Sequence, residues 1–505
     1  MNTYDTRNPY NAVIGGLSRC GVKTPKFRNH LKREFNCFCQ DFYAVLLSDG
    51  AFEMVSVVDY VNSNKSYTRA RKDAIIAEYE AFMQNPTLEA LYEATKIKTF
   101  IKTEWYPSFS KRPRLINPPN DLGKCIMGAL VHSMEKHIYS ALSFWLVKYT
   151  TNSQKMDKLL EIFSDCVNIS CTDFISFESA IKRFLQHCVE TRGYEAYAKR
   201  MDAASIETKA LVLGLVMPQI YNCPEAQFMT DPMRASGTPP TALMNALVQV
   251  VCNLFCYWRA ESALNNISKS QFLSREMNKD RDAAKVKMLV EGDDGLHSHP
   301  TVSVTADMYK DLGIRAKIIK ESSIYTSSFC GQVFSTTKVL FYDPIKFLMR
   351  LGWVGAKYHG ASPKTKRALA AAKVLSYMCC FTQCPIIYPI CLSIYNELGI
   401  KVSAKYLKAV MDPYQYARLD WEQFQLEIPD YDDCATTKFE YCEVYQYLTP
   451  ATCDQVVSDF LKTHRSDIID QELPYEYFVA YEECYRYCRR DYTELSESDL
   501  YSWVC

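Results

Sequence analysis

The feature that most constrains the fold is the segment 288–297, which reads M-L-V-E-G-D-D-G-L-H. Short apolar runs on both sides of a glycine-bounded polar turn predict a β-hairpin, since Gly292 and Gly295 adopt positive φ at little cost. Asp293 and Asp294 then lie together at the tip, where their mutual repulsion favours a divalent cation such as Mg2+. Taken alone, such a segment is more often a solvated turn, so its partners elsewhere in the chain decide its meaning.

Length and charge set broad bounds. The 505 residues correspond to about three domain-sized units. Because 58 basic residues balance 58 acidic ones, a nucleic-acid partner has to be held by local rather than net charge. The polar N-terminus lacks a secretory apolar region, and no run is typical of a membrane span. The longest apolar stretch, 242–258, is interrupted by Asn245, Gln249 and Asn253. If the protein works at a membrane, something else would therefore have to tether it there.

The 21 cysteines are scattered, and many lie in apolar stretches. No Cys-x-x-Cys pair has a second half at zinc-finger spacing. We therefore expect free thiols in a reducing compartment. A zinc site among Cys434, Cys442 and Cys453 is the weaker alternative.

The densest basic segment is 96–118, K-I-K-T-F-I-K-T-E-W-Y-P-S-F-S-K-R-P-R-L-I-N-P. Alternation in its first half predicts a strand, which Pro107 and Pro113 interrupt. The segment is either a solvated strand edge, where lysine is common, or a tunnel wall for an incoming triphosphate. The cations concerned are Lys96, Lys98, Lys102, Lys111, Arg112 and Arg114.

The segment 165–187 predicts a strand at 167–172 followed by a helical pattern from Phe177. Asp173 then falls at the carboxyl end of the strand, where α/β folds place ligand-binding groups. Glu178 lies five residues further on, near the helix start. A carboxylate there has two interpretations, a functional group or a simple partner for the helix N-terminus.

The segment 234–258 begins with a polar loop, Ser236-Gly237-Thr238, and continues as a long apolar helix. Two prolines, 239 and 240, fit a first helical turn, with Thr238 as N-cap. Thr241 and Asn245 share a helix face at i and i+4, and Gln249 extends that polar stripe. Such a stripe either packs the helix or belongs to a site.

The remainder of the chain predicts a helix at 304–312 ended by Gly313, a strand at 315–320 and a second tight hairpin at 328–334. Lys320 is a lone lysine, for which a solvated position is the more frequent outcome. The pattern is mostly helical from about residue 345. From 420 it becomes acidic and tyrosine-rich, so we expect this part to face away from nucleic acid.

Taken in order, these motifs resemble those of the RNA-dependent RNA polymerases of positive-strand RNA viruses, over about residues 96–345. The Asp-Phe-x-Ser-Phe-Glu form at 173–178 is similar to the tombus- and noda-like branch. The resemblance implies an α/β (α+β) right-hand fold with fingers, a palm whose antiparallel sheet is backed by helices, and a helical thumb. It divides the chain into an N-terminal region with fingers (1–164), a first palm segment (165–187), a fingers insertion (188–232), the remaining palm (233–345), and the thumb with the C-terminal region (346–505).

The resemblance also implies template-directed nucleotidyl transfer with two Mg2+ ions, for which Mn2+ substitutes. Asp173 and Asp293 would hold the metals, with Asp294 in support. The polymerase would bind RNA template and product, NTPs and other viral replication proteins, in the host cytoplasm at membrane sites reached through a partner. For the substrate, the resemblance implies recognition of the ribose 2′-hydroxyl by Glu178, Ser236, Thr241 and Asn245, and binding of the triphosphate by Lys102, Lys111, Arg112 and Arg114. It implies that Gly237 lets its loop move and that Lys320, or alternatively Lys317, donates a proton. The hairpin at 328–334 would hold the primer end.

Two rival functions are weighed against this one. A reverse transcriptase usually carries an aromatic residue before its Asp-Asp turn and a bulky gate against the 2′-hydroxyl. Gly292 and the polar pair Glu178 and Asn245 argue against it. A non-catalytic RNA-binding scaffold is disfavoured by the presence of both Asp173 and Asp293.

Overall fold

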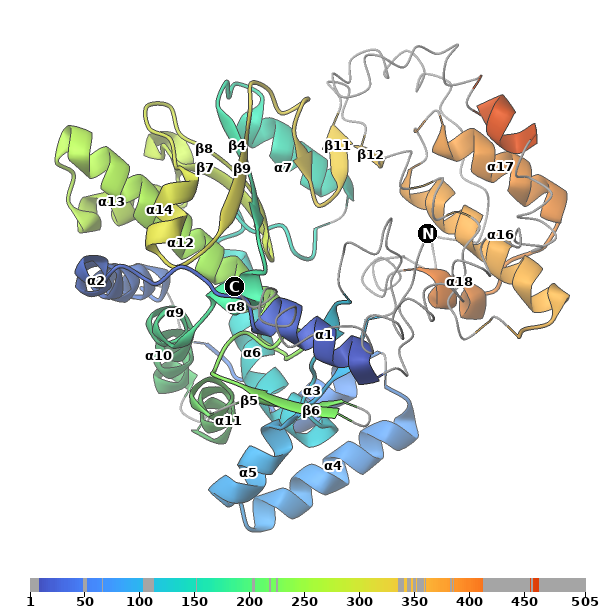
Figure 1. Cartoon of the computed structure of the whole chain (residues 1–505), viewed down its shortest axis with the longest axis horizontal. Helices are drawn as coiled ribbons and strands as arrows, with labels where there is room; N and C mark the ends of the chain where they lie inside the picture. Colours follow the sequence, from blue (N-terminus) through green and yellow to red (C-terminus); the bar gives the residue numbers. More distant parts are fainter. Residues whose placement is uncertain are drawn as a thin grey trace, which may run out of the picture.

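The computed structural model is a mixed α/β protein, mostly helical, with several small sheets that are antiparallel apart from one strand pair (Figure 1). It describes residues 9–48, 52–65, 67–102, 113–150, 152–201, 205–217, 219–223, 226–334, 340–342, 347, 351, 358, 360–381, 384, 386–411, 455 and 457–462.

The largest sheet of the described structure is four-stranded and antiparallel, in the order β7-β8-β4-β9. Its strands are β4 (Ile169–Phe174), β7 (Lys287–Glu291), β8 (Asp294–Ser298) and β9 (Ala316–Glu321). Glu291 pairs with Asp294, so Gly292 and Asp293 form a two-residue loop. Gly292 has φ +67°, which suits the first loop position of a type II′ hairpin. The hairpin predicted at 288–297 is confirmed.

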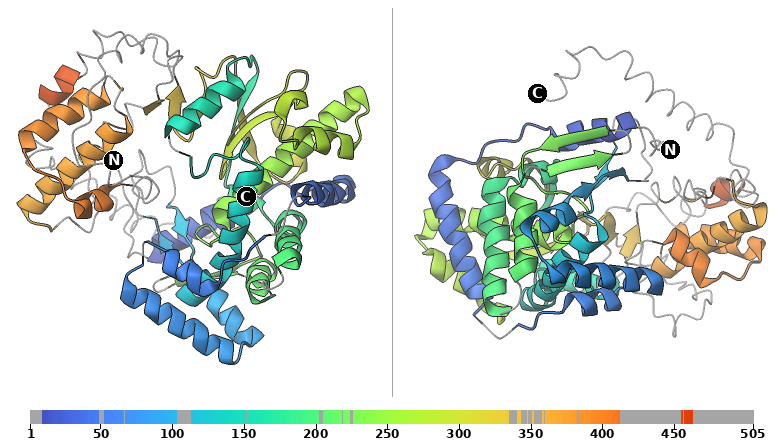
Figure 2. Two further views of the ribbon diagram at one scale, coloured as in Figure 1. Left: turned by 180° about the vertical axis from the view of Figure 1, so that it is seen from behind. Right: turned by 90° about the horizontal axis from the view of Figure 1, so that it is seen from below.

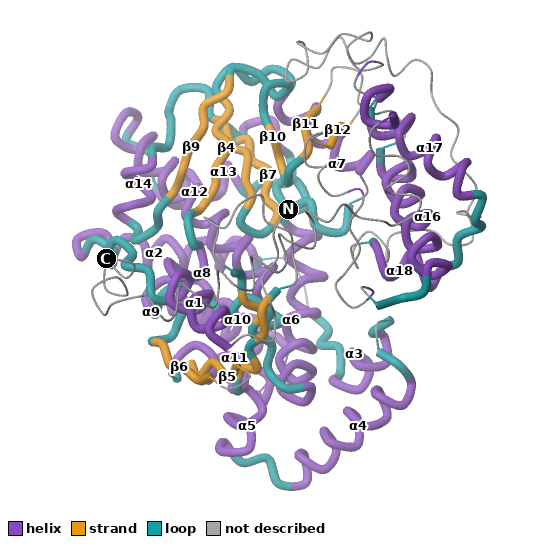
Figure 3. Tube along the Cα trace, turned by 45° about the vertical axis from the view of Figure 1, so that its right-hand side comes forward, coloured by secondary structure: helices purple, strands orange, loops and turns teal. Residues whose placement is uncertain are grey.

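The two faces of this sheet, called here the central sheet, pack against different elements. Side chains alternate along a strand, so Thr172 faces one side and Cys171 the other. The Thr172 face is covered by α12 (Thr241–Asn265) and α14 (Ala306–Asp311), whose tyrosines lie against it. The Cys171 face packs on α7 (Asn152–Phe163) and β10 (Ser328–Phe329), as Figure 3 shows.

The smaller sheets lie around the central sheet. In one, β5 pairs parallel with β1 and antiparallel with β6, and in another β2 pairs antiparallel with β3. The third has the order β10-β11-β12, in which β10 and β11 form the hairpin predicted at 328–334. These strands are β1 (Ile97–Lys98), β2 (Phe100–Ile101), β3 (Leu115–Ile116), β5 (Gln219–Cys223), β6 (Ala226–Thr230), β11 (Gln332–Phe334) and β12 (Leu340–Tyr342).

An N-terminal helix, α1 (Pro9–Cys20), lies between the central sheet and the β5-β6 hairpin (Figures 1 and 2). It packs against β6, β2, β3 and α8 (Phe177–Ala180). The other helical segments of this part are α2 (Asn29–Leu46), α3 (Val57–Ser63), α4 (Arg69–Gln84), α5 (Leu88–Thr95), α6 (Asp121–Ala141), α9 (Arg183–Leu185), the π-helix η1 (Gln186–Thr191), α10 (Arg192–Met201), α11 (Ser205–Val216), α13 (Lys269–Glu276) and the 3-10 helix η2 (Arg281–Ala283).

Two main hydrophobic cores result. The larger surrounds α12, which is buried along most of its length by α2, α6 and the central sheet. Of the helices that the structure describes, α12 is the one whose length and composition would allow it to cross a membrane, and 89% of its most apolar window is buried inside the protein. The second core joins α16 (Pro363–Cys380), α17 (Ile387–Leu398) and α18 (Ala404–Val410). The helical pattern predicted after residue 345 is confirmed there.

Several local predictions need correction. The strand predicted at 167–172 is β4, which continues through Asp173. The helix predicted from Phe177 is only one turn long, because Ile181 leaves helical geometry. Thr238 is not an N-cap, since α12 begins at Thr241 after Pro240. The cysteines in the described ranges are free thiols, as expected, whereas Cys434, Cys442 and Cys453 lie outside them.

Candidate active site on the central sheet

The structure brings Asp173 and the Gly-Asp-Asp turn to one end of the central sheet. The antiparallel pairing of β4 with β8 runs from Ser170 opposite His297 to Thr172 opposite Gly295. The next residues along these two strands are Asp173 and Asp294. All three aspartates are exposed at this end, where the tip of the hairpin meets solvent. The register therefore brings Asp173 next to Asp294 on the neighbouring strand, and Asp293 lies one residue before Asp294 in the loop of the same hairpin.

The pKa of Asp294 shows that these carboxylates interact. Partial desolvation raises it from 3.8 to about 6, and the negative charges of Asp293, Asp173 and Glu291 add to the rise. A divalent cation would remove that repulsion, so the donor set fits such an ion. Even so, among the described residues no three His, Cys, Asp or Glu side chains converge closely enough to hold a metal ion as they stand.

A glutamine from α12 supports the turn from behind. In the amide orientation that satisfies its hydrogen bonds, Gln249 donates to the carbonyl oxygens of Gly292 and Asp294, at 3.2 and 3.3 Å. Gly295 makes room for it, because a Cβ there would lie 2.0 Å from the Gln249 side-chain amide. Asn253, one turn further, bonds to Met288 and Tyr309. The polar stripe predicted on this helix therefore continues beneath the hairpin.

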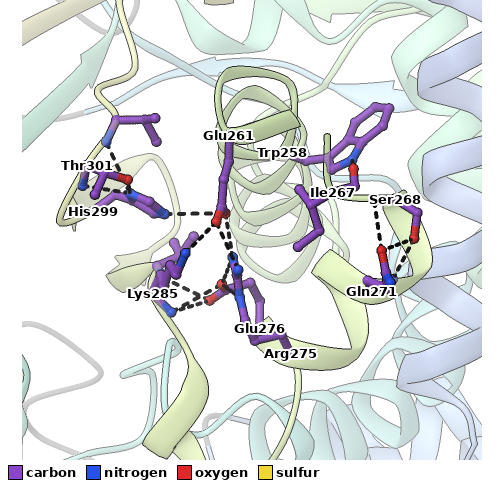
Figure 4. Close-up of polar contacts among 12 residues, drawn as sticks. Trp258, Glu261, Ile267, Ser268, Gln271, Arg275, Glu276, Lys285, His299 and Thr301 are labelled. Atoms are coloured by element: carbon purple, nitrogen blue, oxygen red, sulfur yellow. Dashed lines mark hydrogen bonds and ion pairs between the residues drawn. The ribbon is translucent and has the colours of Figure 1, made fainter. Parts of the chain in front are cut away.

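A buried cluster fixes the far end of the same hairpin (Figure 4). Glu261 of α12 accepts hydrogen bonds from Arg275 and Lys285, at 2.9 and 2.7 Å. Burial alone would raise the pKa of Glu261, but these cations lower it to about 2. Glu276 accepts from the backbone N–H of Val286, the residue before β7. Gln249 and Glu261 are about 18 Å apart along the helix. One helix thus holds the hairpin at both ends.

A buried cation lies on the other side of the turn. Lys155 of α7 donates to Glu291 Oε2 at 2.7 Å, and its side chain is only 6% exposed. Cys330, at the tip of the β10-β11 hairpin, lies 3.6 Å from the same carboxylate oxygen. Burial and the neighbouring Glu291 raise the pKa of the Cys330 thiol. The hairpin predicted to grip a primer end is therefore packed directly beside the Gly-Asp-Asp turn.

The residues predicted to recognise a ribose are partly committed to other contacts. Glu178 accepts from Arg19 Nη1 at 3.3 Å. Thr241 Oγ1 accepts from Gly237 N–H at 3.3 Å and donates to the carbonyl of Ala235 at 3.2 Å, so it holds the 236–238 loop. Asn245 is buried, and its Oδ1 is without a hydrogen-bond partner in the described structure. Asn245 therefore has unmet hydrogen-bonding capacity in the protein interior.

The basic segment docks on that loop. Asn117 N–H donates to the Ser236 carbonyl at 2.7 Å, and a Cβ at Gly237 (φ +108°) would lie 2.9 Å from Asn117 N. Only glycine fits this close approach. Lys102 and Arg114 lie opposite each other at the open end of the β2-β3 pair, where Lys102 N–H donates to the Arg114 carbonyl at 2.8 Å. The predicted site residues Lys111 and Arg112 lie outside the described residues.

The register of β9 separates the two candidate proton donors. Lys317 pairs directly with Asp173, whereas Lys320 pairs with Ser170, so the two lysines face opposite sides of the central sheet. Lys320 Nζ donates to Ser170 Oγ at 2.8 Å, on the face covered by α12 and α14. Partial burial lowers the pKa of Lys320, which would favour proton release, but its side chain points away from Asp173. Position therefore favours Lys317, the alternative, over Lys320.

Three contributors were not identified in the sequence. Arg19 and Lys155 are ordinary cations of amphipathic helices, and no local pattern distinguishes them. Cys330 lies in a predicted turn, but nothing in the sequence placed it beside Glu291. Gln249 alone carried a signal, namely its i+4 spacing from Asn245.

Comparison with known proteins found no relative, since the chain matches no family model and no curated protein.

Proposed function

We propose that the chain is an RNA-directed RNA polymerase that joins ribonucleotides on an RNA template. The observation that carries the proposal is the meeting of Asp173 with the Gly-Asp-Asp turn at one end of the central sheet, where partial desolvation and the neighbouring negative charges raise the pKa of Asp294. In the proposed right-hand fold, the central sheet with α12 and α14 is the palm. The region of β1–β3, β5 and β6 belongs to the fingers, and α16–α18 belong to the thumb.

The residues of the proposed site have different roles in catalysis and substrate binding. Asp173 and Asp293, with Asp294, would hold Mg2+, which when bound would activate the primer 3′-hydroxyl and stabilise the leaving pyrophosphate. Lys317 lies where it can donate a proton on the Asp173 face of the sheet. Lys102 and Arg114 would meet the triphosphate, and Asn245 with Glu178 would meet the ribose. Replication of a viral genome in host cytoplasm, together with other replication proteins, is part of this proposal.

The test is incorporation of labelled ribonucleotides by the purified full chain on an RNA template with Mg2+. We expect template-dependent product, its loss in EDTA, and its loss in Asp293→Ala. RNA binding by this variant, measured by fluorescence anisotropy, should persist, because the change removes a carboxylate and no cation. Asp307→Ala, on the surface of α14, is a matched control that removes a carboxylate away from the turn.

Other outcomes would identify the rivals. Incorporation of deoxyribonucleotides in preference to ribonucleotides would indicate a reverse transcriptase. RNA binding without incorporation by the wild-type chain, under conditions in which the protein is folded, would indicate a non-catalytic scaffold. An Asp293→Ala protein that polymerises at the wild-type rate would remove Asp293 from the site.

A further inference from the structure

An ion pair connects the N-terminal helix to the segment that follows Asp173. Arg19, in the last turn of α1, lies 3.3 Å from Glu178 Oε1, and both side chains are partly buried, at 30% and 20% exposed. Ser179 Oγ also donates to the Arg19 carbonyl oxygen. The contact therefore involves both the side chain and the backbone of Arg19, and it joins residues 159 positions apart.

The same helix is fitted closely to the basic segment. A Cβ at Gly15 would lie 2.9 Å from the Pro113 carbonyl oxygen, and a Cβ at Gly16 would lie 2.4 Å from the Phe228 ring. Two successive glycines thus let α1 approach the β2-β3 pair and β6 at a distance that alanine would not allow. Because α1 is fixed on that side, the position of Arg19 is fixed as well, and with it the position of Glu178.

The Glu178 carboxylate is held by one oxygen. Arg19 bonds to Oε1, and no other side chain in the described part of the chain donates to this carboxylate. A glutamate side chain that is free to rotate would lose much conformational entropy on binding a hydroxyl. With Oε1 tied to a guanidinium, the second oxygen can accept a hydrogen bond from a ligand without that loss.

We propose that Arg19 is a positioning residue for sugar recognition, which holds Glu178 so that its free oxygen meets the ribose 2′-hydroxyl. This role rests on the proposed polymerase function. It assigns α1, which lies outside the motif-bearing region, to the nucleotide site. It also means that a ligand or partner that displaced α1 would weaken ribose selection without touching the aspartates.

The test compares kcat/KM for ATP and dATP on a poly(U) template. Arg19→Met should lower the ATP preference by about three- to tenfold, as expected for loss of a partly buried ion pair that orients a hydrogen-bonding group. Arg19→Lys should retain part of the preference. Arg28→Met is the matched control, since Arg28 forms an exposed pair with Asp311 at 3.0 Å and does not contact Glu178.

A double-mutant cycle separates positioning from general damage. If Arg19 acts through Glu178, then Arg19→Met should change the sugar preference by less than about twofold in a Glu178→Gln background. Arg19→Gln tests the same point should Arg19→Met fail to fold. An unchanged ATP preference in the Arg19 variants, or an equal loss in both backgrounds, would overturn the role of Arg19 alone. A folded wild-type chain with no RNA-templated activity would instead defeat the proposed function, and this inference with it.

Discussion

The buried ammonium of Lys155 lies 2.7 Å from the carboxylate of Glu291, the residue that precedes the Gly-Asp-Asp turn. Four carboxylates gather at this end of the central sheet, those of Asp173, Glu291, Asp293 and Asp294. Lys155 balances one of these charges from α7, so the remaining three stay available for a cation.

Replacing Lys155 by Met should therefore destabilise the protein, because Glu291 would lose its counter-charge in a partly buried position. We expect a loss of about 1–3 kcal/mol in the free energy of unfolding, measured by urea denaturation. Adding Glu291→Gln to Lys155→Met should recover part of that loss. Lys158→Met is the control, since Lys158 is on the same helix but bonds to the Ser143 carbonyl. Equal losses of unfolding free energy in Lys155→Met and Lys158→Met would show that the Lys155–Glu291 pair stabilises the protein no more than the control contact does.

The raised pKa of Asp294 predicts how Mg2+ and pH affect stability. Without metal, folded Asp294 binds a proton more tightly than unfolded Asp294, whose ordinary value is 3.8. Its charge therefore destabilises the fold above a pH of about 6, and the effect is relieved as the pH falls through that value. In EDTA, Asp294→Asn should raise the melting temperature at a pH of about 8 more than at about 5. Mg2+ should stabilise the wild type more at the higher pH. A melting temperature that does not change with Mg2+ at either pH would exclude a cation site here.

The register of β9 predicts different outcomes for its two lysines. Lys317→Ala should lower kcat by about 10²-fold or more with little change in KM, as loss of a general acid does. Lys320→Ala should leave kcat within about threefold, since Lys320 bonds to Ser170 on the opposite face. Single-turnover rates on a preformed RNA primer–template measure both. The reverse result would return the proton-donor role to Lys320.

Gly295 is expected to be intolerant of a side chain because of Gln249. Gly295→Ala would push the Gln249 amide off the turn and remove its two hydrogen bonds. We expect a loss of about 1–3 kcal/mol in unfolding free energy, together with a lower rate of nucleotide incorporation. Gly295→Ala combined with Gln249→Ala should cost less stability than the two single changes summed. Strict additivity would mean that the two residues do not interact.

Replacing Asn245 should change selectivity but not stability. Its buried Oδ1 lacks a partner, and such a group costs free energy in the protein alone. Asn245→Ala should therefore be about as stable as the wild type in thermal unfolding. Its preference for ATP over dATP should fall by about tenfold or more, since a buried group that reads a hydroxyl would be lost. A variant with unchanged preference would remove Asn245 from ribose recognition.

Local structure was largely predictable from the sequence. The hairpins at 288–297 and 328–334, the strand before Asp173 and the stop at Gly313 follow from apolar alternation and from glycines that take positive φ. These signals act over a few neighbouring residues, so they are visible in the chain itself. The candidate aspartates were also chosen from the sequence, through the resemblance of the combined motifs to polymerases rather than from any single motif.

Only the tertiary structure decided which residues support those aspartates. Lys317 and Lys320 differ by three positions, so they lie on opposite faces, but the pairing of β9 with β4 determines which one faces the same side as Asp173. Lys155 and Gln249 reach the turn from α7 and α12, and Arg19 reaches Glu178 from α1, across long separations in the sequence. Packing of buried surfaces, rather than local propensity, brings such residues together. The pairing register of β9 cannot be determined from a single sequence, because it is set by packing in the folded chain.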